Sequence, residues 1–72
     1  MNFSEESPAK ALEKLLKRKK ELEKELEVLL KRKEKGEISE EEFSKQKRNI
    51  EKEYIEIMDR IAQLKYLASL WG

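Results

Sequence analysis

Leucine recurs with a helical period through the first half of the chain. From Leu12 onward the apolar residues are separated alternately by three and four positions, which places them along one face of an α-helix. This spacing predicts an amphipathic helix over about residues 8–35, with a seam of the coiled-coil type. The seam residues are Leu12, Leu15, Leu22, Leu26 and Leu29, Lys19 takes one seam position, and Leu16 and Leu30 widen the stripe.

The second half of the chain carries a second seam, which continues almost to the last residue. Its positions are Phe43, Lys47, Ile50, Tyr54, Ile57, Ile61, Leu64, Ala68 and Trp71. A seven-residue repeat held over four heptads predicts a helix over about residues 40–71 and a left-handed supercoil. We interpret Lys19 and Lys47 as structural residues, because a lysine in a seam sets register and its long stem can reach water.

Helix-capping residues separate the two patterns. Ser7-Pro8 is typical of a helix start, and Gly36 meets the positive φ of a helix C-terminal cap. Ser39 can cap the amide of Glu42, whose side chain can reach back to complete a capping box. A turn over residues 36–39 is short enough to force the helices antiparallel. The sequence therefore predicts an all-α fold, one two-helix antiparallel coiled-coil hairpin over residues 1–72.

This register also predicts which residues lie side by side. With the turn centred near residues 37–38, Leu29 should lie near Gln46 and Lys47, and Leu22 near Tyr54. Further from the turn, Leu15 should lie near Ile61 and Leu12 near Leu64. The last turn of the second helix then extends past the start of the first.

The C-terminal half of the second helix is apolar on more than one side, although the first helix can cover only one. We expect another chain to cover the remainder. In one reading a homodimer completes a four-helix bundle, and in the other a helix of a partner protein docks there. The expected interface consists of Ile55, Met58, Ala62, Tyr66, Leu67, Leu70 and Trp71.

Composition excludes several kinds of chemistry. The chain has neither Cys nor His, and therefore lacks the usual general base, thiol nucleophile and soft metal ligands. We expect a protein that is not an enzyme and that uses no cofactor or metal. Abundant Glu and Lys with few Asn and Gln make it thermophile-like, although a small designed helical protein would look similar. No apolar run reaches the length of a membrane span, and we expect a cytoplasmic protein.

Basic residues suggest an alternative function. Lys and Arg total 17 against 16 Asp and Glu, so the net charge of +1 does not select a partner class. Two short basic runs in the first helix could contact nucleic acid or an anionic surface, as an alternative to pairing with glutamates three or four positions away. The candidate anion contacts are Lys17, Arg18, Lys20 and Arg32.

The turn resembles that of a known type of helical hairpin. Residues 35–43 read Lys-Gly-Glu-Ile-Ser-Glu-Glu-Glu-Phe and are followed by Lys47 and Ile50. This stretch is similar to the Gly-x-Ile-Ser/Thr-x-Glu-Glu-Phe turn of short hairpin modules of the SHOCT type, and more distantly to the hairpins of ESCRT-I subunits. The resemblance implies oligomerisation or assembly with a protein partner.

Overall fold

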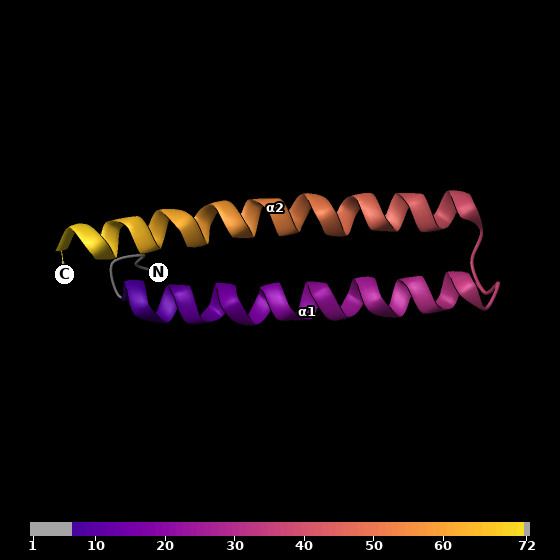
Figure 1. Cartoon of the computed structure of the whole chain (residues 1–72), viewed down its shortest axis with the longest axis horizontal. Coiled ribbons are helices and arrows are strands. Elements are labelled where there is room, and N and C mark those ends of the chain that lie inside the picture. The colour runs from indigo at the N-terminus through magenta and orange to yellow at the C-terminus, as the bar shows by residue number, and fades with distance from the viewer. Residues whose placement is uncertain (1–6, 72) are drawn as a thin grey trace, which may run out of the picture.

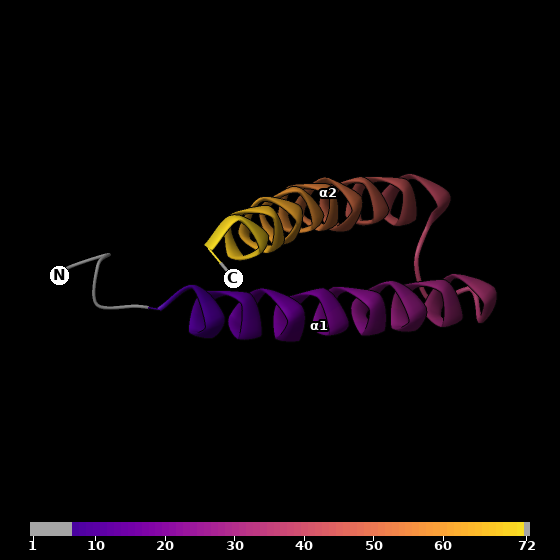
Figure 2. The ribbon, with the colours of Figure 1, turned by 60° about the vertical axis from the view of Figure 1, so that its left-hand side comes forward.

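Two long antiparallel α-helices form the described part of the chain. The computed structural model describes residues 7–71, in which α1 spans Pro8–Glu34 and α2 spans Glu40–Trp71. Both views show the two helices side by side, joined by one short turn (Figures 1 and 2). The predicted all-α helical hairpin is thus confirmed, and residues 7–71 contain no strand. The molecule measures 50 × 25 × 15 Å, so it is long and thin.

Capping hydrogen bonds are made at both the start and the end of α1. The Ser7 hydroxyl accepts a hydrogen bond from the amide of Lys10 at 3.1 Å, and Pro8 takes the first helical position. At the other end, the amide of Glu37 donates to the carbonyl of Arg32 at 2.9 Å, and that of Gly36 to Lys33 at 3.0 Å. These two bonds form a Schellman motif, in which Gly36 has a φ of 74°.

The start of α2 is only half of the predicted capping box. The Ser39 hydroxyl accepts from the amide of Glu42 at 3.0 Å, as predicted. The Glu42 carboxylate, however, accepts a hydrogen bond from the side-chain amide of Gln46 at 2.8 Å instead of reaching back to Ser39. The expectation for Glu42 was therefore wrong, because a residue four positions along a helix is a close neighbour that competes for the carboxylate.

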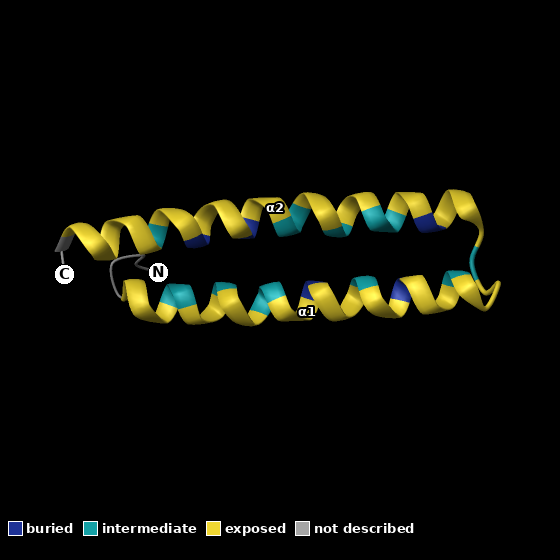
Figure 3. Ribbon diagram, in the orientation of Figure 1, coloured by how far each residue is buried: buried dark blue, intermediate teal, exposed yellow. Residues whose placement is uncertain are grey.

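The core is a single line of apolar contacts between the helices. Figure 3 shows that the buried and half-buried residues of each helix face the other helix. The fully buried residues include Leu22, which is 1% exposed and packs with Ile57 and Ile61. No polar side chain is buried in residues 7–70. The buried apolar residues are Leu22, Leu29, Phe43, Ile57 and Ile61.

The observed register agrees with the spacing of the seams. Leu22 and Tyr54 line one surface groove, and Leu29 and Gln46 line another. Near the open end of the hairpin, Leu15 lines a groove with Leu64 and packs against the cluster around Leu22. Only the end of α2 extends past Pro8, where α1 begins, because α2 is 32 residues long and α1 only 27 (Figure 1).

Candidate interaction surface

An arginine clamp joins the two helices on one side of the hairpin. The Arg18 guanidinium donates to both oxygens of Glu53, with Nε–Oε2 at 2.7 Å and Nη2–Oε1 at 2.9 Å. Its Nη1 donates to Glu21 at 3.2 Å and to Glu25 at 3.0 Å. Hydrogen bonding to Glu53 raises the pKa of Arg18 further, and the same bonds lower the pKa of Glu53. We call this side the charged flank, defined by Arg18, Glu21, Glu25 and Glu53.

A second polar cluster marks the opposite side. The Tyr54 hydroxyl donates to the Glu23 carboxylate at 3.0 Å, which also pairs with the Lys19 ammonium at 3.1 Å. The Lys19 nitrogen lies 5.9 Å from the centre of the Tyr54 ring. Hydrogen bonding to Glu23 raises the pKa of Lys19, and the bond from Lys19 lowers the pKa of Glu23. Lys19 thus links the helices from the edge of the seam while its ammonium group remains in water.

Apolar side chains continue the Tyr54 side toward the open end of the hairpin. On α2, Met58 and Ala62 follow Tyr54 at intervals of four, and on α1, Leu16 precedes Lys19 by three. Residues at these spacings lie next to one another on a helix surface. Their exposed fractions are high, with Ile55 at 68%, Tyr66 at 63% and Leu16 at 40%. We call this side the apolar flank, defined by Leu16, Ile55, Met58, Ala62 and Tyr66.

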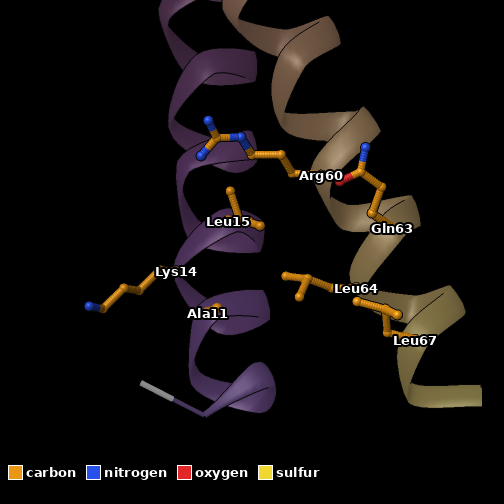
Figure 4. A pocket seen from close by; sticks show the side chains of 7 residues that line it. All are labelled: Ala11, Lys14, Leu15, Arg60, Gln63, Leu64 and Leu67. Atoms are coloured by element: carbon orange, nitrogen blue, oxygen red, sulfur yellow. The ribbon is translucent and has the colours of Figure 1, made fainter. Parts of the chain in front are cut away.

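Two leucines of the expected interface do not continue this flank. Leu67 lines a groove near the open end, in which Leu15 and Leu64 point toward one another and Arg60 extends from α2 toward α1 (Figure 4). Arg60 and Gln63 also line a groove with Glu53, so this groove lies on the charged flank. Leu70 is 60% exposed in the last turns of α2. The side chain of Trp71 lies outside the described residues.

The structure divides the described residues of the expected interface between different sides of α2. Ile55, Met58, Ala62 and Tyr66 lie together, whereas Leu67 faces the charged flank. Leu16 of α1 was not among the expected interface residues, because in the sequence it only widens the apolar stripe of the first helix. The spacing of three residues between Leu16 and Lys19 was the available signal in the sequence. This spacing does not separate a seam residue from a flank residue, because the difference depends on how the helix is rotated about its axis.

The four candidate anion contacts do not lie on one surface. The Arg18 guanidinium is shared by three carboxylates, and Arg32 lies 3.7 Å from Glu37. Lys17 and Lys20 are exposed and three positions apart on α1. This arrangement places two lysines in water on one side and holds the Arg18 guanidinium toward α2.

In the part of the chain that the structure describes, no group of three or more Asp or Glu side chains could hold a metal ion. Neither α1 nor α2 combines the length and apolar character needed to cross a membrane.

Comparison with protein-family models, curated proteins and solved structures finds no match to this chain. The resemblance of the turn to SHOCT-type hairpins therefore stays a prediction. The interaction surface is interpreted from its own geometry alone.

Proposed function

We propose that this chain is a helical assembly module, which binds protein helices through apolar side chains that its own hairpin leaves in water. The observation that carries the proposal is an imbalance in burial. In the described residues, five apolar side chains are buried and eight large ones are exposed. The exposed ones are Leu16, Val28, Leu30, Ile55, Met58, Tyr66, Leu67 and Leu70.

The energetic argument favours association over an isolated hairpin. A single core in a chain of this size supplies roughly 3–5 kcal/mol. Burying one Leu, Ile or Met side chain contributes about 1.5–3 kcal/mol, so covering a few of the exposed ones matches the whole intramolecular core. Helices that pack alongside a hairpin, as in a four-helix bundle, provide such cover.

The proposed function predicts that stability depends on protein concentration. Thermal unfolding followed by circular dichroism at about 1 and about 100 µM should show a higher midpoint at the higher concentration, because association stabilises the folded chain by mass action. A fully helical chain with the same midpoint at both concentrations would contradict the proposal. Unrelated monomeric helical hairpins of similar length, measured alongside, provide the control.

A further inference from the structure

We infer that the apolar flank packs against the same flank of a second copy of this chain, with the open ends of the two hairpins at the same end of the dimer. The inference rests on the proposed function, and names the partner and the surface. It assigns Leu16 of α1 to the interface together with Ile55, Met58, Ala62 and Tyr66 of α2.

The chain exposes more surface than a compact protein of the same mass. The hairpin exposes 6160 Å², whereas a compact protein of this mass exposes about 4,700 Å². The excess of roughly 1,500 Å² is larger than the roughly 800 Å² that each partner buries in a standard interface. The radius of gyration, 16.0 Å, also exceeds the about 11 Å expected of a compact domain of this length. One further hairpin laid along the molecule lowers the exposed area per chain and brings the radius of gyration closer to that of a compact protein of the combined length.

A second copy fits because a twofold dimer needs one self-complementary surface. The apolar flank includes side chains from both helices, so when two such flanks meet, α1 of each copy can lie over α2 of the other. Leu16 of one copy then lies near Met58 and Ala62 of the other. The net charge of +1 adds little repulsion between two identical chains.

The charged flank is the less suitable side for this contact. Its guanidinium and three carboxylates are still partly in water, with Arg18 at 37% and Glu53 at 42% side-chain exposure. Burying them under a second hairpin would remove water from four charged groups, a cost that ion pairing does not reliably offset. The apolar flank also contains the ion pair Lys19–Glu23, but its open half exposes the apolar side chains Leu16 and Met58.

The direction of the two copies follows from where the apolar side chains lie. The open half of the flank contains Leu16, Met58 and Ala62, whereas the ion pair Lys19–Glu23 lies near the middle of α1 and the ion pair Lys47–Glu51 lies nearer the turn. Hairpins pointing in opposite directions would place apolar side chains over these ion pairs. Hairpins pointing in the same direction place apolar residues over apolar residues.

The first test compares matched substitutions on the two flanks. Met58→Glu and Leu16→Glu place a carboxylate on the apolar flank. Leu67→Glu and Val28→Glu place one on the side of the charged flank, where Val28 lines a groove with Glu25. The four side chains have similar exposed fractions, 39%, 40%, 46% and 45% in that order. We expect the first two variants to weaken dimerisation at least about 30-fold, as for a hot-spot residue, and the other two to leave it nearly unchanged.

Sedimentation equilibrium measures the affinity, and circular dichroism confirms that each variant is helical when associated or at high concentration. Ala62→Glu provides a second α2 substitution on the apolar flank in case Met58→Glu fails to fold. Loss of the dimer with Leu67→Glu or Val28→Glu, but not with Met58→Glu or Ala62→Glu, would overturn the inference and leave the proposed function standing. A wild-type trimer or tetramer would also overturn it, whereas a stable wild-type monomer would contradict both.

The second test measures the direction of the copies. Because the chain contains no Cys, Glu41→Cys provides one labelling site in the first turn of α2, close to the hairpin turn. Electron paramagnetic resonance should give a distance between the two spin labels of less than half of the 50 Å length of the hairpin. A distance near the full length would show hairpins in opposite directions and would overturn the inferred arrangement.

Discussion

At the scale of single residues, a few long polar side chains link the two helices at the edges of the apolar seam. Arg18 binds both oxygens of Glu53, and Tyr54 donates to Glu23 from the other side. Both interactions join residues more than thirty positions apart, and neither polar group is buried. They orient the two helices from the edges of an apolar seam, whose burial supplies the main stabilisation.

The Arg18–Glu53 pair predicts a dependence of stability on pH. Because the folded pKa of Glu53 is lower than its ordinary value of 4.5, the unfolded chain binds more protons in acid, and folding is favoured less. This contribution is fully present above about pH 5 and is lost as the pH falls below 4.5 through the folded pKa. Urea unfolding at several pH values should show that Glu53→Gln is less stable at pH 7 but loses less stability in acid.

Glu56→Gln is the control for this measurement, because Glu56 lies on the same helix and its side chain is exposed. An acid dependence that is equal in Glu53→Gln and in the wild type would show that the Arg18 clamp does not contribute to stability.

At the scale of helices, the boundaries follow from local chemistry. Ser7 and Ser39 cap the two starts, and the end of α1 is closed by the positive φ of Gly36. The sequence contains these signals within a few residues of each boundary, so the helices and the turn could be predicted directly. The register between the helices was also predictable, because a short turn leaves little freedom for sliding.

The rotation of each helix about its axis was harder to predict. Leu16 and Leu15 are neighbours in sequence, yet Leu15 packs on the core and Leu16 is exposed. Arg18 belonged to a basic run in the sequence, and its three carboxylate partners depend on the position of Glu53 on the other helix. A side-chain contact of this kind depends on how both helices are placed, so the sequence of one helix does not predict it.

Replacing Gly36 tests the account of the turn. Gly36→Ala should destabilise the hairpin by about 1–2 kcal/mol, the cost of a left-handed conformation for a residue with a Cβ atom. A Cβ atom placed there meets no other atom within 4 Å, so the predicted cost comes from the backbone conformation. Gly36→Asn should cost less, since Asn tolerates this region. Urea unfolding at one fixed concentration measures both, and equal stability of the Ala variant and the wild type would contradict this account.

At the scale of the whole molecule, the proposed dimer would make the hairpin half of a four-helix bundle. Five buried apolar residues form the line between α1 and α2, and a larger number of exposed ones lie outside it. Charged side chains stabilise one flank, whereas the other flank is apolar over the open half of the hairpin. A second hairpin in the same direction would bury that half and leave the Arg18 clamp in water. The unit that folds with a sufficient core would then be the dimer.

The mass of the wild-type chain in solution tests this account most directly. Sedimentation equilibrium at micromolar concentration should give twice the chain mass of 8.6 kDa, and dilution should shift the population toward a less helical chain of single mass. A species of 8.6 kDa that keeps its full helicity on dilution and unfolds cooperatively would contradict the central claim, because it would show that one hairpin is stable alone.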